Sequence, residues 1–173
     1  VLDKASELSK ELKKNFRVKL DDTDNSAGWK FSEYEMKGVP VRLEIGPKDI
    51  ENGQCVLVSR HNREKTIVKL DNLAEEIAKK LQEVHDGLFQ RALENRENRT
   101  WSATTLEDMI KTADENNGFI KAMWCGDVEC EEKLKEVAGV SSRCMPFEQE
   151  QLSDKCVCCG KPAKKMVYWG KAY

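Results

Sequence analysis

The chain has 173 residues, of which 35% are charged and 39% are hydrophobic. These values are ordinary for one large or two small globular domains. The sequence has no run of about 18 apolar residues, so it predicts no membrane span. The net charge of −2 excludes a polycation that binds nucleic acid indiscriminately, so any such contact must come from a local site.

The N-terminal half predicts a mixed α/β unit. Apolar residues recur with a helical period over residues 2–14, and they alternate with charged residues over 16–20, which predicts a half-buried strand. A long helix is expected over 72–98, with Gly87 as its weak point. The other predicted elements are a helix over 26–38 and strands over 39–45, 54–60 and 64–70.

The C-terminal part predicts a smaller α/β unit. The polar stretch 96–101 is the best candidate for a boundary, so we expect domains over residues 1–100 and 101–173. A core of that size often needs a staple. The predicted elements after the boundary are helices over 104–117 and 130–137 and strands over 119–124, 142–147 and 164–169.

Two cysteine pairs supply such a staple. Cys125 and Cys130 form one pair, and Cys156 and Cys159 form a C-x-x-C-G knuckle. Pairs at this spacing are typical of a structural zinc site with four thiolates, which leaves no coordination position open for catalysis. With no export signal, metal ligation is favoured over a disulfide framework. Cys158 lies inside the knuckle and could compete as a ligand.

The remaining cysteines and one acidic pair have plainer interpretations. Cys55 and Cys144 lie in apolar strand contexts, where free cysteine commonly packs as a small buried hydrophobe. Asp21 and Asp22 could bind a hard cation, but they lack the ligand spacing of a calcium loop. A turn or capping role is favoured for this acidic pair.

Residues 28–49 gather aromatic, acidic and basic side chains on a predicted helix and strand. Phe31 and Glu35 are four apart and share a helix face, whereas Arg42 and Glu44 share the strand face opposite the core. An aromatic ring beside a carboxylate and a guanidinium can recognise an unstacked base. The alternative is that Trp29 and Phe31 belong to the core and that the charges form a solvated surface.

Residues 28–49 closely resemble the anticodon-binding domain of prolyl-tRNA synthetases of the archaeal and eukaryote-like type. The stretches 125–130, 142–147, 156–163 and 170–173 resemble the zinc-binding domain that follows it in those enzymes. The resemblance implies the fold class: a mixed β-sheet with flanking helices (the class IIa anticodon-binding fold), followed by a small zinc-stabilised α/β domain.

The resemblance also implies site residues. It places Phe31, Glu35 and Arg42 at the second and third anticodon bases, both guanine in proline transfer RNAs. It implies a basic residue in the hairpin after Arg60, assigned to Lys65 with Arg63 as the alternative. The implied zinc ligands are Cys125, Cys130, Cys156 and Cys159, and the C-terminal Tyr173 matches a tyrosine whose carboxylate approaches the catalytic domain.

The resemblance implies a role in a larger enzyme. The parent reaction would be ATP-dependent attachment of proline to tRNA(Pro) by a cytoplasmic homodimer, with structural zinc here and ATP and magnesium in a catalytic domain. The catalytic domain, with its class II motifs, is expected to be absent from this sequence, so the chain alone should be inactive, and the anticodon-binding domain is expected to lack its first strand. No DNA or membrane partner is expected. The alternatives are a free-standing zinc-stabilised RNA-binding or regulatory module, and a thiol enzyme that uses Cys158 or Cys144.

Overall fold

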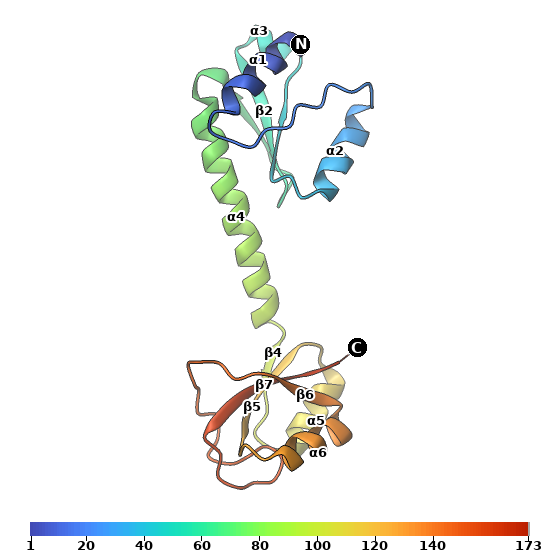
Figure 1. Cartoon of the computed structure of the whole chain (residues 1–173), viewed down its shortest axis with the longest axis vertical. Helices are drawn as coiled ribbons and strands as arrows, with labels where there is room; N and C mark the ends of the chain where they lie inside the picture. Colours follow the sequence, from blue (N-terminus) through green and yellow to red (C-terminus); the bar gives the residue numbers. More distant parts are fainter. Residues whose placement is uncertain (173) are drawn as a thin grey trace. The chain divides into compact units, whose positions relative to one another are not determined.

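The computed structural model describes residues 1–172, and Tyr173 lies outside the described residues. The chain forms two compact α/β units that divide between Arg91 and Ala92 (Figure 1). This confirms the predicted fold class, while the domain boundaries of 1–100 and 101–173 stay a prediction. Among residues 1–172, no helix is both long and apolar enough to cross a membrane.

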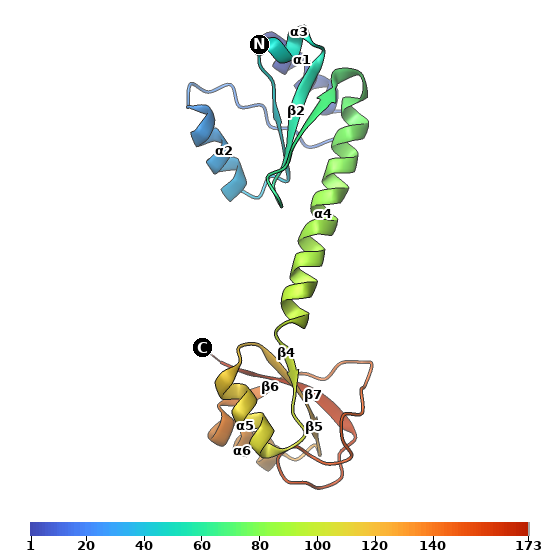
Figure 2. The ribbon, with the colours of Figure 1, turned by 180° about the vertical axis from the view of Figure 1, so that it is seen from behind.

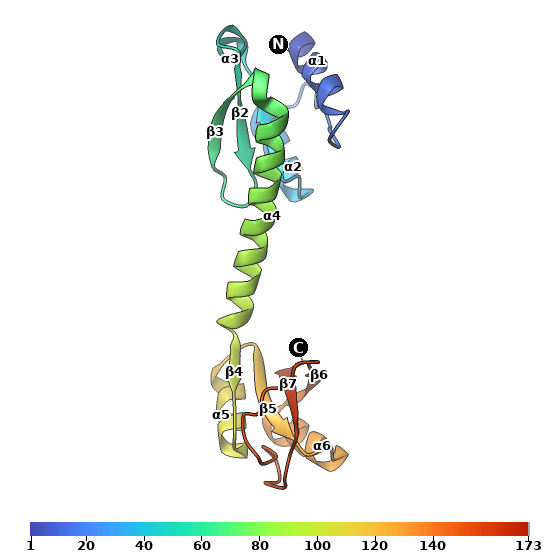
Figure 3. The ribbon, with the colours of Figure 1, turned by 90° about the vertical axis from the view of Figure 1, so that its left-hand side faces the viewer.

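The first unit contains a three-stranded antiparallel sheet in the order β1-β2-β3. Figure 3 shows α4 running alongside this sheet. The elements are α1 (Leu2–Leu12), α2 (Ala27–Met36), β1 (Val41–Glu44), α3 (Pro47–Glu51), β2 (Gln54–Ser59), β3 (Lys65–Lys69), the 3₁₀ turn η1 (Leu70–Asn72) and α4 (Leu73–Glu97).

The two faces of this sheet have different neighbours. Alternation along β2 buries Cys55 and Leu57 against Leu8 and Leu12 of α1 and Ile77 of α4. The opposite face of the sheet carries the side chains that alternate with Cys55 and Leu57 along β2. The helix α2 buries none of its residues. The Ser26 hydroxyl caps its N-terminus by accepting a hydrogen bond from the Trp29 N–H. One face of the sheet therefore holds the core, and α2 lies near the surface.

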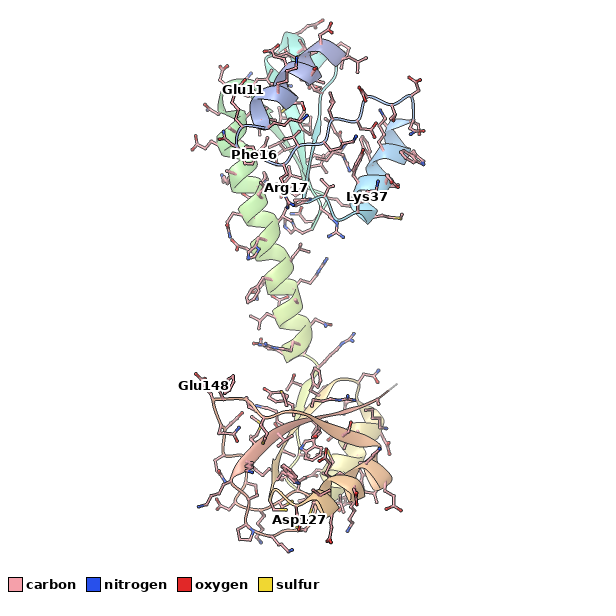
Figure 4. The ribbon with its side chains drawn as sticks, viewed as in Figure 1. Glu11, Phe16, Arg17, Lys37, Asp127 and Glu148 are labelled. Atoms are coloured by element: carbon pink, nitrogen blue, oxygen red, sulfur yellow. The ribbon has the colours of Figure 1, made fainter. Side chains whose placement is uncertain are left out.

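The predicted strand over residues 16–20 is wrong. The apolar side chains do alternate toward the interior, and Phe16 and Val18 pack against the core. Figure 4 labels Phe16 and Arg17 in the connection between α1 and α2. Within the part of the chain that is described, however, this segment pairs with no strand, and a groove of about 720 Å³ lies between it and β1. Alternation predicts which side is buried, but a strand also needs a neighbour to complete its hydrogen bonds.

The short helix α3 was not expected, because the sequence predicted only a strand that ends at residue 45. Proline suits the first helical position, where its missing N–H costs nothing. The Asp49 carboxylate accepts a hydrogen bond from the Gly46 N–H at 2.9 Å. Proline therefore begins a helix directly after the strand.

The second unit contains a four-stranded sheet in the order β4-β5-β7-β6. Strands β4 and β5 are parallel, and the other pairs are antiparallel. Figures 1 and 2 place both helices on the same side of this sheet. The elements are β4 (Thr100–Ser102), α5 (Leu106–Glu115), β5 (Phe119–Trp124), α6 (Val128–Ala138), β6 (Val140–Cys144) and β7 (Lys165–Lys171).

Two clusters fill this unit, one on each face of the sheet. Trp169 of β7 is fully buried beneath the helices, against Met109 of α5 and Leu134 of α6. Met123 and Met166 are buried on the opposite face, in the cluster that holds Cys130 and Cys156. The last strand therefore lies in the middle of the sheet and carries part of both clusters.

Candidate functional site

Arg42 is the centre of a cluster of aromatic and charged side chains in the first unit. Its guanidinium carbon lies 3.8 Å from the centre of the Phe31 ring. Its Nη1 donates to Glu35 Oε1 at 3.0 Å, and its Nε and Nη2 both lie 2.9 Å from Glu44 Oε1. The side chains of Arg42, Glu44 and Glu35 are 18%, 22% and 31% exposed, so the cluster is accessible but incompletely solvated.

Strand register explains why these side chains meet. Arg42 pairs with Val58 on β2, which pairs in turn with Lys65 on β3, so the three lie in one row across the sheet. Directly opposed residues share a face, and Glu44 shares it too because it lies two positions beyond Arg42. The prediction that Arg42 and Glu44 share a face opposite the core is confirmed, since Leu43 pairs with the buried Leu57.

Both candidates for the basic hairpin residue reach this cluster by different routes. Lys65 Nζ lies 3.3 Å from Glu44 Oε2. Arg63 Nη2 lies 3.6 Å from Glu35 Oε2. Three cations and two carboxylates leave a net charge of +1, a balance that suits hydrogen bonding to bases better than strong attraction to phosphates.

Two residues of this region, Glu44 and Arg60, were not predicted as site residues from the sequence. Glu44 was placed on the correct face, and its spacing from Arg42 was the available signal. Arg60 donates from Nε to the backbone oxygen of Glu35 at 3.0 Å, which ties the last turn of α2 to the end of β2. No sequence pattern links residues 25 positions apart in this way. The alternative that Trp29 belongs to the core is wrong, because this side chain is 50% exposed.

The four cysteines of the predicted metal site converge in the second unit. The four Sγ atoms of Cys125, Cys130, Cys156 and Cys159 all lie within 4.8 Å of one another. Cys125 Sγ is 3.7 Å from Cys130 Sγ and 3.9 Å from Cys159 Sγ. Sulfurs placed tetrahedrally about 2.3 Å from zinc are roughly 3.8 Å apart, so the residues fit a four-thiolate zinc site.

Local structure positions both pairs. Cys125 follows β5, and Cys130 lies in the first turn of α6, which begins directly after Asp127, labelled in Figure 4. The knuckle is a tight turn in which the Gly160 N–H donates to the Cys156 oxygen at 2.9 Å. Gly160 adopts φ +71°, a conformation that L side chains resist, which explains the glycine after the second knuckle cysteine.

The knuckle favours the ionised, thiolate form of Cys156. Burial works against ionisation of Cys156, but backbone N–H groups of Cys159 and Cys158 donate to its sulfur and lower its pKa to about 7. Burial raises the pKa of the Cys125 and Cys130 thiols, so without a metal these two hold their protons. A dication would reverse that preference, because metal ligation requires thiolate.

The other cysteines differ from one another. Cys55 is fully buried as predicted, and burial raises its pKa to about 11. The prediction of a buried Cys144 is wrong: it is exposed at the end of the edge strand β6, beside a register shift. Burial also raises the pKa of Cys158, the opposite of what a nucleophilic thiol requires.

The two units match two families of known domains. Residues 1–80 match the family described as Anticodon binding domain. Residues 106–173 match the family described as Prolyl-tRNA synthetase, C-terminal. The class of protein is therefore an anticodon-binding domain joined to a synthetase C-terminal domain. The chain belongs to the prolyl-tRNA synthetase family, of which it carries these two domains.

Relatives with known names match the whole chain. It is 62% identical to a proline–tRNA ligase of Clostridium novyi and 61% identical to proline–tRNA ligase 2 of Bacillus thuringiensis. It is 60% identical to a proline–tRNA ligase of Ruminiclostridium cellulolyticum. Each match covers 100% of the chain and 36% of the relative, so the chain spans about a third of their length. The resemblance to this family is confirmed, and the archaeal and eukaryote-like subtype stays a prediction.

Proposed function

We propose that the first unit binds the anticodon of tRNA(Pro) and reads its second and third bases with Phe31, Glu35, Arg42 and Lys65. The observation that carries this proposal is the Arg42 guanidinium, held over the Phe31 ring and between two carboxylates. An unstacked base can stack on a guanidinium plane or an aromatic ring. Arginine donates to guanine O6 and N7, and a carboxylate accepts from guanine N1–H and its amino group.

The exposed side chains of α2 support this proposal. Trp29 and Met36 are exposed on a helix that buries none of its residues. These exposed apolar side chains are available to contact a partner. Unpaired anticodon bases offer the apolar faces that this surface would cover.

In the longer protein, we propose ATP-dependent attachment of proline to tRNA(Pro). The named relatives are ligases, and the part of them that matches includes all of this chain. This supports a role in such a ligase over a free-standing RNA-binding module. ATP and magnesium would bind in a catalytic domain, and the enzyme would act as a cytoplasmic homodimer. Arg63 remains the alternative to Lys65, and separate alanine variants of the two residues would decide between them.

A direct binding measurement tests the anticodon proposal. The chain is titrated with an RNA stem-loop that carries guanine at the second and third anticodon positions, and with one that carries adenine at both. Each correct base contact contributes about 1–3 kcal/mol of discrimination, so the guanine loop should bind at least tenfold more tightly. Equal affinity for the two loops at one salt concentration would refute the proposal.

We also propose one structural zinc ion held by Cys125, Cys130, Cys156 and Cys159. Its support is the convergence of four sulfurs in a unit with a small core. Thiolate ligation should make binding acid-sensitive, because protons compete with the metal for sulfur. Metal analysis should find one zinc per chain. A chelated sample that melts at the same temperature as a zinc-loaded one would contradict a structural role.

A further inference from the structure

Glu44 joins two cations that lie on different strands. Arg42 is on β1 and Lys65 is on β3, with one strand between them. The Glu44 carboxylate reaches Arg42 through Oε1 at 2.9 Å and Lys65 through Oε2 at 3.3 Å. Among residues 1–172, Glu44 is thus the side chain that contacts both cations. A carboxylate in a surface that receives RNA repels phosphate, so its presence there requires a compensating role.

The contacts of Arg42 show what that role is. A guanidinium carries five N–H bonds in a rigid plane. Glu44 Oε1 accepts the Nε–H and lies 2.9 Å from Nη2, and Glu35 Oε1 accepts one N–H of Nη1. One N–H bond on Nη1 and at least one on Nη2 then remain outside these hydrogen bonds. A pair of neighbouring donors is what bidentate recognition of guanine O6 and N7 needs.

We infer that Glu44 is a positioning residue for base recognition: it holds the edge of the Arg42 guanidinium so that the remaining donors face the incoming guanine. Phe31 packs against the face of the guanidinium, and Glu44 prevents the guanidinium from rotating in its own plane. The link to Lys65 places the second cation at a set distance from the first. This inference rests on the proposed function, because it assumes that Arg42 reads guanine.

The first arm of the test measures discrimination between the guanine and adenine stem-loops for wild type and Glu44→Ala. The variant should lose about fivefold or more of the discrimination ratio, while its affinity for the adenine loop should stay equal or increase because a negative charge is gone. Glu51→Ala is the matched control, since it removes an exposed carboxylate of α3. An unchanged ratio in Glu44→Ala would overturn the inference. If thermal melts show that Glu44→Ala is unfolded, Glu44→Gln replaces it.

The second arm repeats the substitution in an Arg42→Ala background. A residue that acts through Arg42 should have no further effect on the ratio once Arg42 is absent. A loss of discrimination equal to that seen in the wild-type background would instead mean that Glu44 contacts the base itself, and would overturn a positioning role.

The third arm needs no RNA and separates this inference from the proposed function. The ¹⁵N signal of Arg42 Nε reports side-chain motion in the free chain. We expect restricted motion in wild type and Glu51→Ala, and increased motion in Glu44→Ala. Equal motion in all three would overturn the inference even if wild type discriminates. Equal affinity of wild type for both stem-loops would refute the proposed function alone, and the signal of Arg42 would still decide whether Glu44 holds it.

Discussion

Asp21 shows how one side chain can organise a connection without a strand. Its carboxylate accepts from the Thr23 hydroxyl at 2.6 Å and from the Thr23 N–H at 3.0 Å. Lys30 Nζ of α2 lies 3.4 Å away. These contacts support the turn role that was favoured over cation binding, and they link the connection to the helix that carries Phe31.

The pH dependence of stability follows from these contacts. The hydrogen bond from the Thr23 hydroxyl is the main cause that lowers the pKa of Asp21 from 3.8 to about 2. A depressed folded-state pKa means that the carboxylate stabilises fully above the unfolded value and that this contribution is lost as pH falls toward 2. We predict that Asp21→Asn destabilises residues 1–91 at pH 6 and that the difference shrinks between pH 4 and pH 2.

Urea unfolding followed by amide NMR signals of the first unit measures this difference. A variant that differs from wild type by the same free energy at pH 2 and at pH 6 would show that the Asp21 charge is not involved. Asp24→Asn, in the same connection, is a matched control for loss of one carboxylate.

At the scale of elements, Gly87 in the middle of α4 has a packing reason. A Cβ atom at this position would lie 2.4 Å from His61 Cδ2, so the imidazole of the hairpin packs on the helix backbone here. The same hairpin carries Arg63 and leads into Lys65. The glycine that weakens the helix therefore helps to position a loop beside the candidate RNA site.

A double-mutant cycle tests this packing. Glycine to alanine in a helix interior gains about 0.8–1.0 kcal/mol when nothing interferes. We predict that Gly87→Ala alone fails to stabilise the first unit, because His61 must move, and that it gains about this amount in a His61→Ala background. Denaturant unfolding of the four proteins gives the coupling. The same gain in both backgrounds would mean that His61 does not pack on Gly87 in solution.

The cysteine knuckle offers a second test between neighbours. We predict that Cys159→Ser destabilises the second unit by on the order of 2 kcal/mol more than Cys158→Ser, because only the first removes a zinc ligand. Thermal melts of the zinc-loaded variants measure this difference, and Cys158 serves as the matched control. Equal destabilisation would mean that the wrong pair of knuckle cysteines was chosen.

Local patterns predicted most elements, but not their pairing. The period of α4 and the spacing of the cysteine pairs are visible in the sequence because each depends on residues close along the chain. Residues 16–20 show the limit: alternation indicates the buried side but cannot say whether a neighbouring strand exists. The placement of β7 between β5 and β6 depends on contacts between distant residues, so no local signal shows it.

The candidate site was predicted in part for the same reason. Phe31 and Glu35 share a helix face, and Arg42 and Glu44 share a strand face, as their spacings indicate. That the two faces meet, with Arg42 bonded to Glu35, follows from the packing of α2 beside β1. The roles of Phe31, Glu35, Arg42 and Lys65 in RNA binding came from the family resemblance, and they stay predictions.

For the whole molecule, charge and site point to selective recognition. The chain carries a net charge of −2, so its overall field does not attract RNA. The cluster around Arg42 has a local net charge of +1 and three cations paired with carboxylates. Binding should therefore depend weakly on salt and strongly on base identity, unlike binding through a row of phosphate contacts.

The most direct test of this account is the effect of Arg42→Ala on two RNAs at one fixed salt concentration. The free energy of binding is measured for wild type and variant with a proline transfer RNA and with the same RNA whose anticodon guanines are replaced. We predict a loss of about 1–3 kcal/mol on the natural RNA and a much smaller loss on the substituted one. The same loss on both RNAs would contradict base recognition by Arg42 and would make it a backbone contact or a structural residue.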